Sequence, residues 1–185
     1  MIMPEMDLLD LGISQLYLCE RKIRGVMGWF DPSQAAAYAP LPVRNFGSGR
    51  FTLTDGHSRA YVAYKQGVKR LPVVQDEEEI MTDETGQKLY QQDILWCERF
   101  SLRTIGDLEN RILSQTDYQR LWIDRCDRGY NLLFLCGADR RREMENRFPT
   151  LFLYGCDREA RRFYFEDRQE TRYQFDGGGL SPELP

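Results

Sequence analysis

The sequence holds a single histidine among its 185 residues, and features of several protein classes are missing from it. No stretch approaches the roughly 18 consecutive apolar residues that a membrane-spanning helix needs. The start, MIMPEMDLLDLG, lacks the basic segment and the small-residue cleavage site of a secretory signal. We therefore expect a cytoplasmic protein with no membrane partner.

Cysteine pairs of the kind that build disulfide frames or zinc sites are also missing. The cysteines are odd in number, widely spaced and without a CxxC pair, at Cys19, Cys97, Cys126, Cys136 and Cys156. This spacing matches neither a disulfide framework nor a metal template. We expect reduced thiols, most of them small buried side chains, and no metal site built from a protein cluster.

An excess of positive charge is missing too. The net charge is −4 and the isoelectric point is near 5.2, whereas a general nucleic-acid binder usually carries a basic patch or stripe. Every basic residue after Lys88 is arginine, and acidic residues balance these arginines. The arginine run 140–142 is followed by Glu143 and Glu145, which favours a solvated helix face. DNA is therefore disfavoured as a partner, although a local basic site stays open.

The pattern of the first half predicts a strand-rich unit with helices. Residues 43–46 and 51–54 flank the turn GSG and predict a β-hairpin. Residues 56–66 predict a helix that ends at a glycine, and 70–74 predict another strand, parallel or mixed with the first. We expect the three tryptophans to be core or interface anchors.

The second half predicts helices and then strands. The acidic run from Asp76 to Glu79 predicts a solvated linker or surface edge. Thr104 and Thr116 are each followed three residues later by a side chain suited to a capping box. Two strand-like runs around the polar turn 157–160 predict a β-hairpin.

The histidine lies in a strand-to-helix turn within the segment TLTDGHSRAYVAYKQG. A helix N-terminus exposes unpaired N–H groups and attracts anions. Gly56 lets the backbone approach a ligand, Ser58 supplies a hydroxyl, and Arg59 supplies a fork of donors matched to phosphate. His57 could donate to phosphate oxygens or titrate near neutrality. These residues together are typical of a phosphate site.

Asp55 adds a carboxylate beside that turn. It could hold Mg²⁺ through an oxygen or accept a proton from a hydroxyl nucleophile. An ordinary alternative stays open, since Asp-Gly is common at turns for backbone reasons and Asp55 could simply cap the helix.

The segment FTLTDGHSRAYVAYKQGVKRLPV resembles the core motif of the ParB/sulfiredoxin superfamily, in which a strand, a G-x-x-R turn and a helix bind nucleotide phosphates. It is most similar in form to the DGH-x-R version of the superfamily's free serine kinases, in which ATP or ADP binds and a hydroxyl is phosphorylated. This resemblance covers about residues 13–75. A wider similarity, to small bacterial proteins labelled ParB-like, extends to about residue 127 through WCERFSLRTIGDLENRILSQTDYQRLWIDRCD.

The resemblance implies that Asp55 is the candidate catalytic group and that Gly56, His57, Ser58 and Arg59 form the phosphate-binding turn. Two departures narrow the expected activity. His57 stands where sulfiredoxin has its catalytic cysteine, so we do not expect sulfinic acid reduction. ParB's arginine-rich turn keeps only its glycine and last arginine here, and no helix-turn-helix with a basic face follows, so we do not expect centromere binding.

The kinase family also uses a glutamate from its N-terminal part. Glu20 and Asp31 are the carboxylates in that region, and each is also readable as a surface charge or a cap.

The resemblance implies an α+β fold. We expect a ParB/sulfiredoxin-like nucleotide-binding domain with a mixed sheet and helices over residues 1–80. A helical segment and a C-terminal β-hairpin are expected to follow over 81–176, and then a loose tail over 177–185.

These expectations favour a protein that binds a nucleoside triphosphate of the ATP or CTP type with Mg²⁺ at the DGHSR turn. Such a protein could act as a phosphotransferase on a small hydroxyl-bearing molecule. The alternative is a non-catalytic ParB-like regulatory or adaptor module that binds nucleotide, protein or DNA. A nuclease fits poorly with one histidine and no acidic metal cluster. Self-association stays open.

Overall fold

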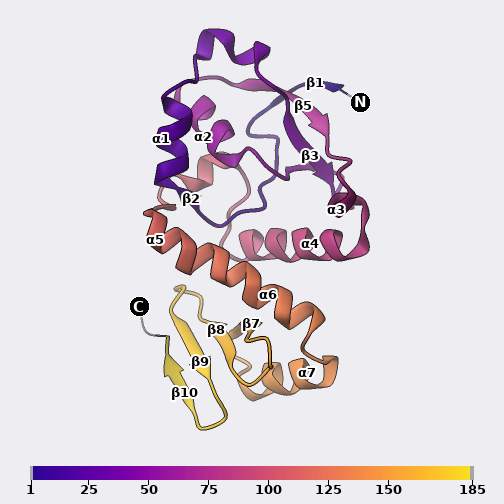
Figure 1. Cartoon of the computed structure of the whole chain (residues 1–185), viewed down its shortest axis with the longest axis vertical. Helices are drawn as coiled ribbons and strands as arrows, with labels where there is room; N and C mark the ends of the chain where they lie inside the picture. Colours follow the sequence, from indigo (N-terminus) through magenta and orange to yellow (C-terminus); the bar gives the residue numbers. More distant parts are fainter. Residues whose placement is uncertain (1, 184–185) are drawn as a thin grey trace. The chain divides into compact units, whose positions relative to one another are not determined.

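The hairpin expected around the turn GSG forms the edge of the first sheet. In the computed structural model of the chain, which describes residues 2–183, strand β3 (Leu41–Asn45) pairs antiparallel with β4 (Phe51–Leu53). Val43 lies opposite Leu53 in this pair, and both side chains are buried. The predicted hairpin is therefore confirmed. Its first strand, β3, is labelled in Figure 1.

Two further strands complete a mixed sheet in the order β1-β5-β3-β4. Strand β5 (Arg70–Gln75) runs parallel to β3, and β1 (Ile2–Asp7) runs antiparallel to β5. Helix α2 (His57–Lys65) provides the connection from β4 to β5. The predicted helix and the predicted strand at 70–74 are both present, so local pattern located this part of the sheet correctly.

Further helices and a short strand pair complete the first part of the chain. Helical elements are α1 (Glu20–Met27), the 3₁₀ turn η1 (Pro32–Ala37), α3 (Glu79–Thr82), α4 (Glu84–Arg99), the 3₁₀ turn η2 (Ile105–Leu108) and α5 (Gln115–Tyr118). A short parallel pair is formed by β2 (Leu18–Cys19) and β6 (Ile112–Leu113). No helix in the described part of the chain has the length and apolar character needed to cross a membrane.

The chain divides into two compact units, residues 1–118 and 119–185. The second unit begins with the π-helical turn η3 (Gln119–Ile123) and continues through α6 (Asp124–Phe134), α7 (Ala138–Arg147), β7 (Phe152–Cys156), β8 (Phe163–Glu166), β9 (Arg172–Phe175) and β10 (Leu180–Pro182). Its strands form an antiparallel sheet in the order β10-β9-β8-β7. The α+β class is therefore as expected.

The division of the chain differs from the one expected at residue 80. Helix α4, η2 and α5 belong to the first unit, so that unit continues to Tyr118. The predicted C-terminal hairpin is present as β7 and β8, but β9 and β10 extend it to four strands. Residues 180–182 of the expected loose tail thus pair with β9, while 184–185 lie outside the described residues. An isolated hairpin is marginal in water, and added strands help to bury its apolar face.

Two other local expectations need correction. Asp76 was expected on a solvated run, but it is buried and its carboxylate accepts hydrogen bonds from the Thr54 hydroxyl and, at 3.1 Å, from the Glu78 N–H. The cap expected at Thr116 lies two residues earlier, where the Ser114 hydroxyl accepts from the Asp117 N–H at 3.1 Å. The Thr104 capping box is present, at the start of η2.

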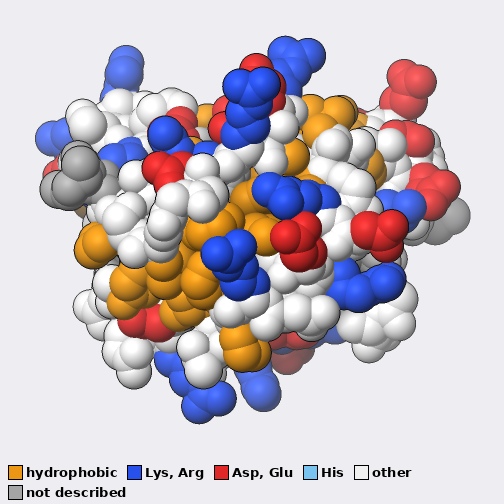
Figure 2. Space-filling view, turned by 90° about the horizontal axis from the view of Figure 1, so that it is seen from below, with side chains coloured by type: hydrophobic (Ala, Val, Ile, Leu, Met, Phe, Trp, Pro, Cys, Tyr) orange, Lys and Arg blue, Asp and Glu red, His pale blue; other side chains and the backbone are white. Residues whose placement is uncertain are grey.

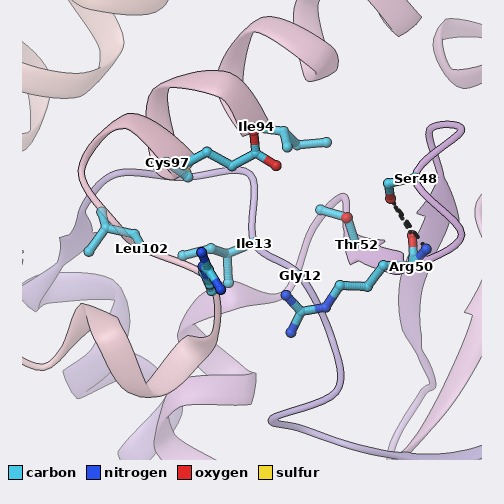
Figure 3. Close-up of a pocket in the computed structure, with 10 residues that line it drawn as sticks. Gly12, Ile13, Ser48, Arg50, Thr52, Ile94, Cys97 and Leu102 are labelled. Atoms are coloured by element: carbon cyan, nitrogen blue, oxygen red, sulfur yellow. Dashed lines mark hydrogen bonds between the residues drawn. The ribbon is translucent and has the colours of Figure 1, made fainter.

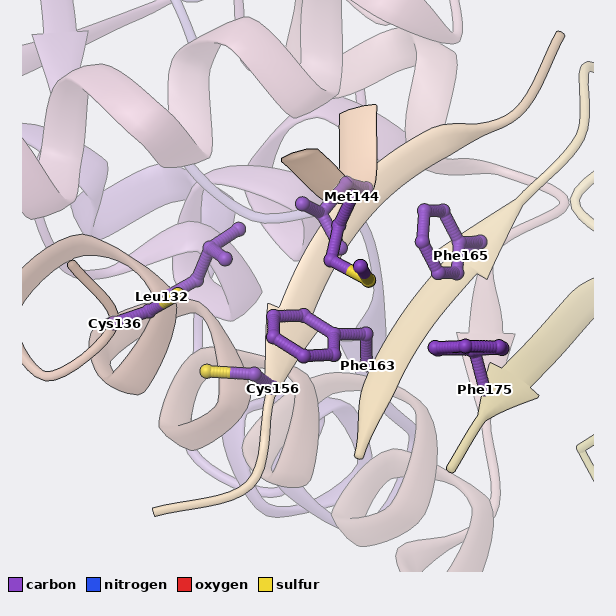
Figure 4. Close-up of a cluster of buried hydrophobic side chains, with 8 residues drawn as sticks. Leu132, Cys136, Met144, Cys156, Phe163, Phe165 and Phe175 are labelled. Carbon is purple, nitrogen blue, oxygen red and sulfur yellow. The ribbon is translucent and has the colours of Figure 1, made fainter. Parts of the chain in front are cut away.

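The second unit has its own hydrophobic core on one face of its sheet. Figure 4 shows Met144 of α7 against the phenylalanines of β8 and β9, with Cys156 nearby. The core consists of Leu132, Cys136, Met144, Leu153, Cys156, Phe163, Phe165 and Phe175. Four of the five cysteines in the chain are buried, as expected for small apolar side chains.

Side chains alternate along a strand, so Glu166 of β8 lies on the face opposite the phenylalanines. On that face it forms a buried ion pair. Arg125 of α6 and Glu166 of β8 are 0% and 1% exposed, and they join through two hydrogen bonds of 2.7 and 2.6 Å. The Arg125 guanidinium also lies 4.5 Å from the ring centre of Tyr154. The two opposite charges thus compensate each other in the interior of the unit.

Replacing the buried carboxylate is expected to destabilise the protein strongly. Glu166→Ala would leave Arg125 buried without its counter-charge and lower the free energy of unfolding by about 3–5 kcal/mol. Urea denaturation followed by circular dichroism measures this change. Glu143→Ala is the control, because Glu143 pairs with Arg140 on an exposed face of α7, where such a pair contributes about 0–1 kcal/mol. Equal losses in the two variants would contradict the prediction.

Candidate functional site

A left-handed glycine shapes the turn that precedes α2. Gly56 has φ +77°, and a Cβ added there would lie 2.7 Å from Leu41 Cδ2. Glycine is therefore required both by the backbone conformation and by close packing. The Ala60 N–H donates to the Gly56 carbonyl at 2.9 Å as the first bond of the helix. The N–H groups ahead of Ala60 have no partner within the helix, as at any helix N-terminus.

The five predicted site residues come together at one hollow of about 550 Å³. It is lined by Gln15, Lys22, Gly25, Val26, Trp29, Asp55, Gly56, His57, Ser58 and Arg59. The hollow therefore lies where the start of α2 meets α1, and all the residues of the DGHSR turn line it.

Helix α1 contributes a wall that the sequence reasoning missed. Lys22, Gly25 and Val26 line the hollow at the spacing i, i+3, i+4, which places them on one face of the helix, and Trp29 lines it from just beyond the helix end at Met27. This spacing could have indicated from the sequence that these residues share a helix face. It could not have indicated that this face lies beside the DGHSR turn.

Trp29 differs from the other two tryptophans. Trp96 and Trp122 are buried, as expected for core side chains, whereas 51% of Trp29 is exposed. Of the two roles expected for it, the core anchor is therefore wrong and the interface anchor stays a prediction; the side chain lines the hollow.

His57 is a buried hydrogen-bond acceptor. It is 2% exposed, and its Nε2 accepts from the Ser14 N–H at 3.1 Å. A neutral ring with this acceptor carries its proton on Nδ1. The buried Nδ1 has no hydrogen-bond partner among residues 2–183. The ring therefore holds one unused donor while it lines the hollow.

Burial also sets the charge state of this histidine. It lowers the pKa of His57 from 6.5 to about 4, with a smaller opposing effect from the Asp55 carboxylate and a smaller lowering effect from Lys22. Titration near neutrality, expected from the sequence, is thus not a property of the folded protein. The ring is neutral at pH 7.

Two cations and one carboxylate give the hollow its electrostatic character. Arg59 is half-buried, and its Nη2 donates to the Pro40 carbonyl at 3.2 Å. Burial lowers the pKa of Arg59 and Asp55 opposes that effect, but an arginine stays charged in proteins. Lys22 is exposed and its Nζ lies 5.4 Å from the ring centre of Tyr118. Asp55 is exposed as well.

Asp76 and Tyr90 form hydrogen bonds with Thr54, the residue before Asp55. Thr54 is buried, and its hydroxyl donates to Asp76 while its carbonyl accepts from the Tyr90 hydroxyl at 3.1 Å. Burial, followed by the nearby acidic groups beginning with Asp93, raises the pKa of Tyr90 to about 12. Tyr90 therefore remains a donor at neutral pH. No local pattern indicated this group, because Asp76 belongs to an acidic run.

The two proposed second carboxylates do not line the hollow. Glu20 is exposed on α1, with its carboxylate 4.0 Å from Arg24. Asp31 caps η1, where it accepts from the Ser33 N–H at 2.9 Å. The residues that the structure describes include no group of three or more histidine, cysteine or acidic side chains that could hold a metal ion.

A second hollow, of about 420 Å³, lies between the β3–β4 hairpin and α4. Figure 3 shows Arg50 extending from the hairpin toward Gly12. Its guanidinium donates to the carbonyls of residues 9, 10 and 11 at 2.9–3.1 Å. These bonds hold the N-terminal segment in place, so the arginine has a structural role.

Charge is mixed over the surface seen in Figure 2, where basic and acidic side chains are interspersed. The arginines of the run 140–142 pair with Glu143, Glu145 and Asp139 on α7. This solvated face is the one expected from the sequence, and it is not a basic stripe.

Comparisons with protein-family models, with curated proteins and with solved structures found no match to this chain. The resemblance to the ParB/sulfiredoxin superfamily therefore stays a prediction from its motif.

Because the His57 ring is buried, we expect its protonation to occur at an unusually low pH, and an NMR titration can measure this. Since the chain has one histidine, its ring signal in an NMR titration is unambiguous, and we expect an apparent pKa near 4. The unfolded chain, with a pKa near 6.5, binds more protons between these values. The free energy of unfolding is therefore highest above pH 6.5. It falls by about 3 kcal/mol, the equivalent of this pKa shift, as the pH falls toward 4.

A variant separates this effect from the titration of carboxylates. His57→Gln can place Oε1 where Nε2 accepts from Ser14 but cannot bind the proton, so its unfolding free energy should depend less on pH between 6.5 and 4.5. Urea midpoints across this range compare the two proteins. A measured histidine pKa near 6.5, or identical pH slopes, would contradict the assignment.

Proposed function

We propose that the DGHSR turn, residues 55–59, binds the phosphates of a nucleoside triphosphate within an N-terminal ParB/sulfiredoxin-like fold. The observation that supports this most is the convergence of three anion-binding features on one hollow. These are the N-terminus of α2, the Arg59 guanidinium and the Lys22 ammonium. A cavity of about 550 Å³ also falls in the range of small-molecule sites, roughly 300–1,000 Å³.

Each group of the turn has a role in this proposal. The N–H groups of the first helical turn and the Ser58 hydroxyl donate to phosphate oxygens. Arg59 supplies two further donors and charge. His57 holds the turn in position, because its Nε2 accepts from the Ser14 N–H. Its Nδ1 is buried, so the ring supports the phosphate-binding groups and does not itself contact the phosphate.

Asp55 is the group proposed to act in phosphoryl transfer to a small hydroxyl-bearing substrate. It would accept the hydroxyl proton while the acceptor oxygen bonds to the terminal phosphorus and the bond to the bridging oxygen breaks. Its exposed carboxylate, beside two cations, also suits an oxygen ligand for the Mg²⁺ that accompanies a triphosphate and offsets its charge.

Nucleotide binding without turnover is the second candidate. It is favoured by the position of Glu20 and Asp31 outside the hollow, which leaves Asp55 as the carboxylate that lines it among the described residues. A regulatory or adaptor module needs only the phosphate contacts.

Binding of Mg²⁺ complexes of ATP, CTP and GTP by calorimetry tests the phosphate site. Arg59→Ala is expected to weaken binding about 10- to 100-fold, because a hydrogen bond to a charged group contributes about 1.5–3 kcal/mol. Arg24→Ala is the matched control, since Arg24 lies on α1 but does not line the hollow. Thermal melting confirms that each variant is folded. If the wild-type protein binds no nucleotide, the proposed function is wrong.

Asp55→Asn distinguishes the two candidate functions. A general base contributes typically 10²–10⁴-fold, so this change should lower transfer to a hydroxyl acceptor by about that factor while nucleotide still binds. Phosphate transfer is measured across a panel of small alcohols and hydroxyl-bearing amino acids. Nucleotide binding with no turnover by the wild-type protein would favour the regulatory module instead.

A further inference from the structure

An exposed tryptophan stands at the rim of the candidate site. Trp29 lines the same hollow as Lys22 and Arg59, and 51% of its surface is exposed. Tryptophan is large and apolar, and leaving half of it in water forgoes much of the stabilisation that its burial would give. The other two tryptophans are buried, so exposure at this position is particular to Trp29.

The ring is held in place by its neighbours. Trp29 contacts Tyr38 at 5.2 Å between ring centres with an interplanar angle of 75°, and Phe30 at 6.1 Å and 63°. Tyr38 donates to the Trp29 carbonyl at 3.2 Å and accepts from the Asp31 N–H at 2.8 Å. Both ring contacts are edge-to-face, and no described ring stacks in parallel on Trp29. The structure thus combines a fixed ring with an uncovered surface.

The position of this ring relative to the cations suits one extended ligand. Lys22 lies in α1, Trp29 follows two residues after the helix ends at Met27, and both side chains line the hollow. A ligand with an anionic group near Lys22 and Arg59 could therefore place a flat group at Trp29. A bare polyphosphate would use only the charged end of the hollow.

We propose that Trp29 is the stacking platform for the base of the bound nucleotide, so that the hollow selects phosphate esters with a flat ring over bare polyphosphate. This inference rests on the proposed phosphate site at residues 55–59. Every base has a π-face, so a single tryptophan selects nucleotides as a class, with little preference among bases.

Parallel titrations with Mg²⁺-ATP and Mg²⁺-tripolyphosphate test the inference. Trp29→Ala should weaken nucleotide binding roughly 10- to 100-fold and leave tripolyphosphate binding unchanged. Trp29→Phe keeps a flat ring and should retain most of the nucleotide affinity. Arg59→Ala should weaken both ligands. Met27→Ala is the control, because Met27 is an exposed apolar residue of α1 that does not line the hollow.

The outcomes separate this inference from the function on which it rests. If Trp29→Ala leaves nucleotide affinity unchanged, or weakens both ligands equally, the stacking role is wrong while the phosphate site stands. If the wild-type protein binds neither ligand, both proposals are wrong. Melting temperatures of Trp29→Ala and Trp29→Phe show whether either change acts through folding.

Tryptophan emission gives a second readout. Trp29 is the exposed one among three tryptophans, so a stacked base should quench and shift the wild-type emission. Tripolyphosphate should cause a much smaller change, and the response to nucleotide should be lost in Trp29→Phe. An equal response to both ligands would overturn the stacking role.

Discussion

The candidate site depends on the hydrogen bond from the Ser14 N–H to His57 Nε2. It joins the segment before β2 to the first residue of α2, across 43 positions of sequence. The Ser14 hydroxyl donates to the Leu53 carbonyl at 2.8 Å, which adds the end of β4 to the same junction. Nε2 can accept this hydrogen bond only while it carries no proton. The turn therefore keeps its geometry only while the ring is neutral.

That constraint gives the two nitrogens of His57 different roles. One is used to position the helix, and the other keeps a proton for which the described protein atoms supply no acceptor. On the other side of the turn, Thr54 is held by Asp76 and Tyr90. Asp55 therefore follows a residue that two hydrogen bonds hold just beyond β4, and groups supported in this way can be preorganised for a ligand.

The two units use buried polar contacts in different ways. In the first, the contacts of His57 and Asp76 surround a turn whose outer side is open to a hollow. In the second, Arg125 and Glu166 pair with each other within a closed interior. The ion pair lies in a closed interior, whereas the turn is open to a hollow that can receive a ligand. The proposals therefore concern the first unit.

The phosphate site proposed at residues 55–59 comes from a motif and stays a proposal. The hairpin strands expected at 43–46 and 51–54 and the helix expected at 56–66 were predictable from the sequence, and both elements are present. These follow from turn chemistry and periodicity, which act over a few neighbouring residues. The burial and neutral state of His57, and the presence of Lys22 and Trp29 at the same hollow as the turn, became known only from the fold. Burial and proximity arise from segments tens of residues apart, and no local spacing encodes them.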